Sequence, residues 1–186
     1  GTALMAAALK GRHPIVLVLL QHSANIDLQC NSGGTALMSA ALNGHEACVK
    51  ALLRAKANVE LLDKDGDSAL LRAEVKGHTA TAALIRQHAA PRRPDTTAAP
   101  AAPAPDAGEP AGAAASLPVE VHRSAKRGDL QKVVRWLRKG GPIDALGSTT
   151  TRSGHPMTGT LLQAAAGYGH LEMVRMLLEQ GASIDQ

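Results

Sequence analysis

Residues 34–53 read GTALMSAALNGHEACVKALL, and this stretch decides the fold. A Thr whose hydroxyl can accept a bond from a first-turn N–H opens an Ala-rich run that ends at Gly44. A second apolar run follows, in which Val49, Leu52 and Leu53 have the three-and-four spacing of one buried helix face. Glycine suits the junction because it tolerates a positive φ. The stretch therefore predicts two short helices joined by a tight turn.

The same pattern recurs along the chain at a fixed period. GTALM at 1–5 returns at 34–38 and, in a weaker form, as DSALL at 67–71, a step of 33 residues each time. A further copy begins at Gly159, and a degenerate copy occupies residues 119–144. One such unit cannot bury its apolar face alone, so a period of this kind is typical of solenoids whose units stack on their neighbours.

Each unit carries the same signals for the ends of its helices. The predicted N-caps are Thr2, Thr35, Ser68 and Thr160, and the predicted turn glycines are Gly11, Gly44, Gly77, Gly128 and Gly169. A histidine follows the turn glycine at His45, His78 and His170. Because these histidines belong to successive layers, without other ligands at tight spacing, we expect a structural hydrogen bond at the second helix rather than metal ligation.

The 33-residue period, with its Thr-x-Leu, Ala-pair, Gly-His and apolar-Leu-Leu motifs, resembles the ankyrin repeat. The family's usual Pro after the Thr is Ala36 in the second unit, and its usual His is Met38. Ala is the strongest helix former, so the fold does not depend on that Pro. The resemblance implies an all-α ankyrin-repeat solenoid of helix-turn-helix units with hairpin-like connections, and a non-catalytic scaffold or adaptor for a protein partner.

The five predicted repeats fall into two groups. The repeats are 1–33, 34–66 and 67–90 in the first group, and 117–149 and 159–186 in the second, which also has an extended loop at 146–158. Residues 91–116, between the groups, are mostly Ala and Pro without an apolar period. Such a composition cannot bury enough apolar surface to offset the cost of ordering, so we expect a disordered linker there.

The order of the repeats along the chain is unusual. Residues 118–144 and 72–88 have the polar character that the ends of a solenoid need, yet they lie in the middle of the sequence. We therefore expect one stack in the order 117–186 and then 1–90, with two separate arrays as the alternative. The chain starts at Gly1 without a Met, and we expect it to be a piece of a longer tandem array whose uncapped ends could self-associate.

The resemblance also implies a partner-binding surface at the hairpin tips and on the concave side of the first helices. Tyr168 stands directly before the turn glycine of its unit, and tyrosine is favoured at interfaces. The expected partner-binding residues are Lys10, Asn31, Ser32, Asn43, Lys64, Asp65, Asp67, Lys76, Lys126, Arg127 and Tyr168.

Basic side chains concentrate in residues 123–139, where seven of them accompany a single acid, Asp129. A solvated cap is the simplest interpretation of this cluster, and an acidic segment of a protein partner is the next. Nucleic acid is a weaker alternative, because stacking aromatic residues are missing. Trp136 has two interpretations as well, either as core packing or as an exposed binding anchor.

The composition argues against several classes of protein. The chain has 20 Lys and Arg against 16 Asp and Glu, no Phe, one Trp and one Tyr, so an aromatic-lined cofactor pocket is not expected. Two cysteines without a CxxC pair argue against a disulfide scaffold, and we expect Cys48 in the core and Cys30 as an exposed thiol. No nucleotide motif, signal peptide or membrane span is visible, so the sequence predicts a non-catalytic protein without cofactor or metal, in the cytoplasm.

Two other functions remain open at this stage. The chain could be a structural module of a long array that stacks mainly on its own neighbours, or an accessory module of an enzyme whose catalytic domain lies outside these residues. The identity of a protein partner does not follow from the repeats, because they specify shape better than specificity.

Overall fold

The computed structural model describes residues 1–89, 117–150 and 156–185, which form ten helices and one two-stranded hairpin. The helices are α1 (Ala3–Leu9), α2 (His13–Gln21), α3 (Ala36–Leu42), α4 (Glu46–Arg54), α5 (Ala69–Val75), α6 (Thr79–Ala89), α7 (Val119–Arg127), α8 (Leu130–Arg138), α9 (Leu161–Tyr168) and α10 (Leu171–Glu179). The strands are β1 (Gly147–Thr150) and β2 (Pro156–Gly159). The disorder predicted for 91–116 lies outside the described residues.

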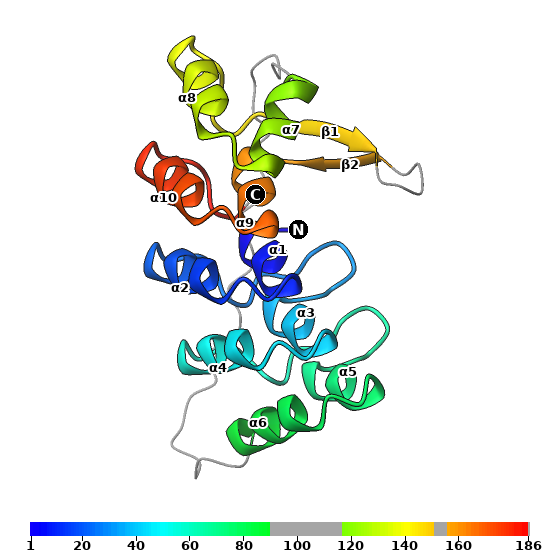
Figure 1. Cartoon of the computed structure of the whole chain (residues 1–186). Coiled ribbons are helices and arrows are strands. Elements are labelled where there is room, and N and C mark those ends of the chain that lie inside the picture. Colours follow the sequence, from blue (N-terminus) through cyan, green and yellow to red (C-terminus); the bar gives the residue numbers. More distant parts are fainter. Residues whose placement is uncertain (90–116, 151–155, 186) are drawn as a thin grey trace, which may run out of the picture.

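The helices form five antiparallel pairs that stack in one column (Figure 1). The first helices contact one another in the order α7, α9, α1, α3 and α5, and the second helices α10, α2, α4 and α6 follow the same order beside them. The contact between α9 and α1 joins the two ends of the sequence, and both termini lie in the middle of the column (Figure 1). The helical solenoid expected from the repeats is confirmed.

The helix ends follow the signals in the sequence. Thr2, Thr35, Ser68 and Thr160 each accept a hydrogen bond from the backbone N–H three residues further on, at 3.2 Å in every case. The five turn glycines all have a positive φ, between 65° and 91°. The predicted N-caps and turn glycines are thus confirmed, and local hydrogen bonding explains why each first helix begins where it does.

Two of the histidines after the turn glycines join their layer to the one before it. Nε2 of His45 lies 3.1 Å from the carbonyl oxygen of Leu9, and Nε2 of His170 lies 2.8 Å from that of Lys126. The expected structural hydrogen bond is confirmed for these two, and it crosses between repeats. In the α1–α2 layer, Arg12 stands at the position that holds the histidine in the two neighbouring layers. Its side chain packs against Gly169, the turn glycine of the α9–α10 layer.

Aspartates in the loops that follow the second helices form a second series of contacts between layers, which we call the aspartate ladder. A carboxylate oxygen of Asp144 accepts from the N–H of Ser183 at 2.8 Å, and one of Asp27 accepts from the N–H of Asn58 at 2.8 Å. Between them, Asp185 accepts from the N–H of Asn25 at 3.0 Å, across the α9–α1 layer boundary. Each aspartate therefore holds the loop of the next layer.

The core is a series of thin layers of aliphatic side chains. Leu177, Leu4, Leu37 and Leu52 are among the fully buried side chains, and they come from three successive layers of the column. Cys48 is fully buried in the same core, as the sequence predicted. Small residues of the Ala pairs fill the space between first helices, which lets these helices approach one another closely.

One segment predicted as a loop contains regular structure. In residues 147–159, which overlap that loop, β1 pairs with β2 in antiparallel register, from Gly147 opposite Gly159 to Thr150 opposite Pro156. The β-branched threonines of these strands favour an extended backbone, and the paired strands lengthen the hairpin-like connection between two repeats. The hairpin extends from the α7–α8 layer on the side of the first helices (Figure 1).

Candidate partner-binding surface

The first helices end in a row of exposed side chains, one for each layer. In the order of the layers these are Arg127, Tyr168, Lys10, Asn43 and Lys76, and we call them the helix-end row. Asn43 also donates a hydrogen bond from its amide to the carbonyl oxygen of Ser39, which caps its own helix. The stacking thus aligns five of the residues that the sequence singled out.

A second group of predicted residues lies at the tips of two neighbouring loops. Asn31 and Ser32 belong to the first tip, and Lys64, Asp65 and Asp67 belong to the second. The N–H of Lys64 donates to the carbonyl oxygen of Ser32 at 3.1 Å, so the two tips are joined through their backbones. All of these side chains are exposed except Asp67, which is half-buried.

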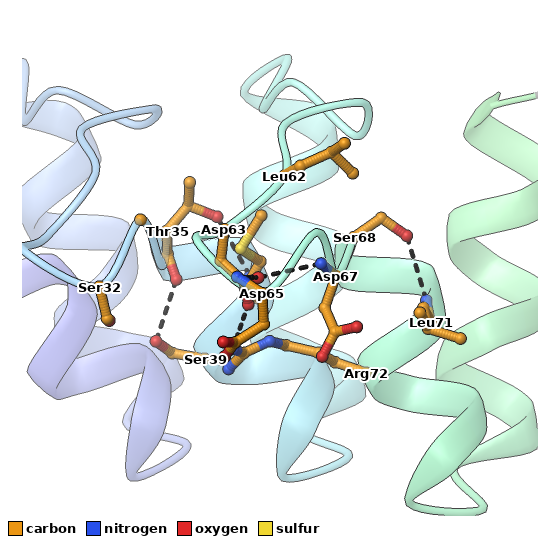
Figure 2. Close-up of polar contacts among 12 residues, drawn as sticks. Ser32, Thr35, Ser39, Leu62, Asp63, Asp65, Asp67, Ser68, Leu71 and Arg72 are labelled. Carbon is orange, nitrogen blue, oxygen red and sulfur yellow. Dashed lines mark hydrogen bonds and ion pairs between the residues drawn. The ribbon is translucent and has the colours of Figure 1, made fainter.

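The second tip is held from inside by Asp63 (Figure 2). Its side chain is fully buried and accepts 2.9 Å hydrogen bonds from the N–H groups of Asp65 and Asp67, as well as a bond from the guanidinium of Arg72. The hydrogen bond from the backbone N–H of Asp67 keeps the pKa of Asp63 below its ordinary value in spite of the burial. The backbone N–H of Asp65 and the guanidinium of Arg72 lower this pKa further. The sequence analysis missed this residue, although an Asp bonded to the backbone two residues on is a common turn signal.

Three predicted residues surround a cavity of about 270 Å³ on the concave side, between α7, α9, α1 and β2. They are Lys10, Lys126 and Tyr168, and Ala6, Leu9 and Ala164 provide apolar lining beside them. Nζ of Lys126 lies 5.7 Å from the centre of the Tyr168 ring, a cation–π arrangement. Burial lowers the pKa of Lys126.

The cavity exists because α9 lacks a side chain where its neighbours have one. Gly167 stands two residues before the turn glycine of its repeat, and the same position holds Lys126 in α7 and Leu9 in α1. A Cβ at Gly167 would meet the Cβ of Ala6 at 3.6 Å, an ordinary contact. The space is therefore open and is not required by close backbone packing.

His122 also lines the cavity, and the sequence analysis missed it. Its side chain is 4% exposed, and its Nδ1 has no hydrogen-bond partner among the described residues. Burial, and secondarily the charge of Lys126, lowers the pKa of His122. Alignment on the turn glycines could have found it, because His122, Gln163 and Met5 each stand six residues before that glycine.

The structure divides the basic cluster of residues 123–139 between two helices. On α7, Arg123 pairs with Glu120 at 2.6 Å, while Lys126 faces the cavity and Arg127 belongs to the helix-end row. On α8, Lys132 pairs with Asp129 at 3.4 Å. Trp136 is half-buried against the core, which favours its interpretation as packing.

Neither a metal-binding cluster nor a membrane-spanning helix is found among the described residues. Within 1–89, 117–150 and 156–185, no three His, Cys, Asp or Glu side chains gather where they could hold a metal ion. None of the helices in these ranges is both long enough and apolar enough to cross a lipid bilayer.

Comparison with known proteins gives matches over most of the chain. A family model of three ankyrin repeats matches residues 4–98, and a model of the single ankyrin repeat matches residues 159–186. Among solved structures, the chain is similar to the crystal structure of the human ASB11 ankyrin repeat domain, with 27% sequence identity and a TM-score of 0.45, over 97% of this chain and 69% of that one. The search of curated proteins finds no similar sequence.

Proposed function

Since the chain belongs to the ankyrin repeat family, whose members are generally protein–protein interaction modules, we propose that it is a scaffold that holds a protein partner along its concave side. The partner lies across the helix-end row and the two loop tips. The chain itself performs no chemistry in this role, and what it contributes is the fixed spacing of side chains from successive layers.

The observation that carries the proposal is the continuity of the helix-end row. Five layers each contribute one exposed side chain, and layer-to-layer hydrogen bonds such as that from His170 to Lys126 fix their spacing. Because the backbone positions of these residues are fixed before binding, this chain loses less conformational entropy on association than mobile loops would. Contacts from several layers then add up along an extended partner.

The character of the surface supports a protein partner as well. Tyr168 is 54% exposed and Leu9 is 41% exposed, and both lie on the concave side beside the cations Lys10 and Lys126. An exposed tyrosine next to an apolar patch with charged neighbours is typical of interfaces between proteins. The loop tips add one cation and two acids, which could fix the orientation of the partner.

The proposal is tested by affinity capture from a cell lysate treated with nuclease, with the whole chain as bait. The concave variant combines Lys64→Ala, Asp65→Ala, Lys76→Ala and Tyr168→Ala. The matched control combines Lys50→Ala, Arg54→Ala, Glu46→Ala and Leu17→Ala, which are exposed positions on the second helices α2 and α4. Both variants remove two cations, one anion and one large apolar group.

We expect a protein that the parent and the control retain and the concave variant loses. Recovery of the same proteins by all three baits would overturn the proposal, because the concave side would then contribute nothing. Loss from the control but not from the concave variant would place the interface on the second helices. Circular dichroism of each variant shows beforehand whether its helices are intact.

A further inference from the structure

We infer that the cavity between α7, α9, α1 and β2 receives one large apolar side chain from an acidic segment of the protein partner. This inference rests on the proposed function and names the chemistry that its central contact recognises. The occupant is a peptide segment with an aliphatic or aromatic residue next to Asp or Glu.

The size and lining of the cavity favour a side chain over a small-molecule ligand. Its volume is about 270 Å³, at the small end of the roughly 300–1,000 Å³ of pockets that hold drug-sized ligands, and this space suits one large side chain. Ala6, Ala164 and Gly167 provide small walls, and Leu9 and the Tyr168 ring provide larger apolar surface. Burying an apolar side chain here would remove both it and these exposed groups from water, which is favourable.

The charge around the cavity is of one sign. Lys10 and Lys126 are its charged lining residues at neutral pH, and none of the described lining residues is an acid. Arg127 lies next to Lys126 in the sequence and is exposed at the end of the same helix. A carboxylate that flanks the apolar anchor would therefore meet cations on either side of Tyr168, whereas a basic peptide would be repelled.

His122 forms part of the inner wall of the cavity. Its imidazole is buried, and Nδ1 packs against Gly147 of β1, where an added Cβ would lie 2.0 Å from that atom. His122 therefore contributes wall surface, and recognition of the peptide rests on the apolar lining and the two lysines.

The glycine that opens the cavity is not explained by the local backbone. Gly167 lies inside α9, and its φ is not among the positive values that the turn glycines have. A Cβ would fit here at an ordinary contact distance from Ala6, so neither the backbone nor the packing of α1 requires glycine at this position. The missing side chain leaves the space that an apolar group of the partner can occupy.

The experiment selects binders from a display library of short random peptides on the immobilised whole chain. The affinity of the selected peptides is then measured for the parent and for three variants. Gly167→Leu fills the cavity with the residue that Leu9 supplies at the same position of the next repeat, and Lys10→Ala removes a cation. Lys50→Ala is the matched control, because it removes an exposed cation from the second helix α4, outside the proposed binding surface.

We expect selected peptides that share one large apolar residue close to Asp or Glu. Gly167→Leu should weaken their binding by about tenfold or more, Lys10→Ala by several-fold, and Lys50→Ala should leave it unchanged. Affinity should also fall as salt is raised, because the flanking contact is electrostatic. Melting curves of each variant distinguish lost binding from lost folding, and Lys10→Ala tests the site even if Gly167→Leu fails to fold.

The inference is overturned if no peptide is selected, if the selected peptides lack the acidic and apolar pairing, or if Gly167→Leu binds them as the parent does. Selection of basic peptides would equally contradict it. None of these outcomes decides the proposed function, which stands or falls on the capture comparison between the concave variant and its control.

Discussion

The carboxylate of Asp185 accepts a hydrogen bond from the backbone N–H of Asn25, a residue that lies 160 positions earlier in the chain. Asp27 makes the equivalent bond to Asn58 within the first group of repeats, and Asp144 makes it to Ser183 within the second. The boundary between α9 and α1 therefore carries the same interaction as boundaries between consecutive repeats. The stack is therefore continuous across the α9–α1 boundary, although the two repeats that meet there lie at opposite ends of the sequence.

Replacing Asp185 with alanine should weaken the junction between the two ends of the sequence. The N–H of Asn25 would lose its acceptor, and we expect a decrease of about 0.5–1.5 kcal/mol in the free energy of unfolding. Chemical denaturation of the purified chain measures this change. Glu60→Ala is the control, because Glu60 occupies the same repeat position and its exposed side chain holds no following loop among the described residues. Equal losses for both variants would argue against the ladder as a stabilising interaction.

The turn glycines should differ in their tolerance of alanine. Gly77 has φ of 74° with nothing within 4 Å of a Cβ, so Gly77→Ala should cost about 1–2 kcal/mol from backbone strain alone. Gly44 has a similar φ of 67°, but a Cβ there would lie 2.5 Å from Nδ1 of His78. We expect Gly44→Ala to lower the melting temperature more than Gly77→Ala does.

The double variant Gly44→Ala with His78→Ala separates the two contributions. Removing the imidazole abolishes the collision, so the further loss caused by Gly44→Ala in this background should approach that of Gly77→Ala in the parent. If Gly44→Ala costs the same stability in the parent and in the His78→Ala background, the close approach of His78 to Gly44 does not contribute to the cost of the substitution.

Asp63 should make the stability of the chain depend on pH in the acidic range. Its pKa is lower in the folded state than the ordinary value of about 3.9, so the ionised form stabilises the fold above that value. This stabilisation is lost as the pH falls through the folded-state pKa. Asp63→Asn should lower the melting temperature at pH 7 and reduce the difference between neutral and strongly acidic pH. Asp65→Asn, at an exposed neighbour, should leave that difference unchanged.

Gly167→Ala should stabilise the protein. The substitution adds a helix-favouring residue with an ordinary contact to Ala6, and we expect an increase of about 0.5–1 kcal/mol in the free energy of unfolding. Thermal melts of the parent and the variant test this directly. A decrease would mean that α9 and α1 are packed too closely at this point for even one methyl group.

The sequence predicted the helices because their signals are local. Thr35 caps a helix through an N–H three residues away, and Gly44 ends that helix through its own φ, so neither depends on the rest of the chain. The partner-binding residues remain predictions, but the structure brings several of them together. Lys10, Lys126 and Tyr168 line one cavity. Their positions in the repeats indicated a shared concave surface but did not indicate the cavity.

What the sequence analysis missed depends on contacts between distant residues. The cavity at Gly167 arises from the absence of a side chain between Lys126 and Leu9, which becomes visible only when α7, α9 and α1 are side by side. The pairing of β1 with β2 depends on register, which a Ser/Thr/Gly composition does not specify. The role of Asp63 depends on Arg72, nine residues further on, whose guanidinium meets the buried carboxylate only when the loop and α5 are folded together.

The position of both termini in the middle of the column has a consequence for folding kinetics. Every layer boundary except the one between α9 and α1 joins repeats that are neighbours in the sequence and can form through local contacts, which are fast. The α9–α1 boundary forms only when the two arms of the chain meet, so we expect it to close last and to open first. The entropy of that closure grows only with the logarithm of loop length. The length of the segment between α6 and α7 should therefore affect the rate of closure only weakly, provided that the segment can span the column.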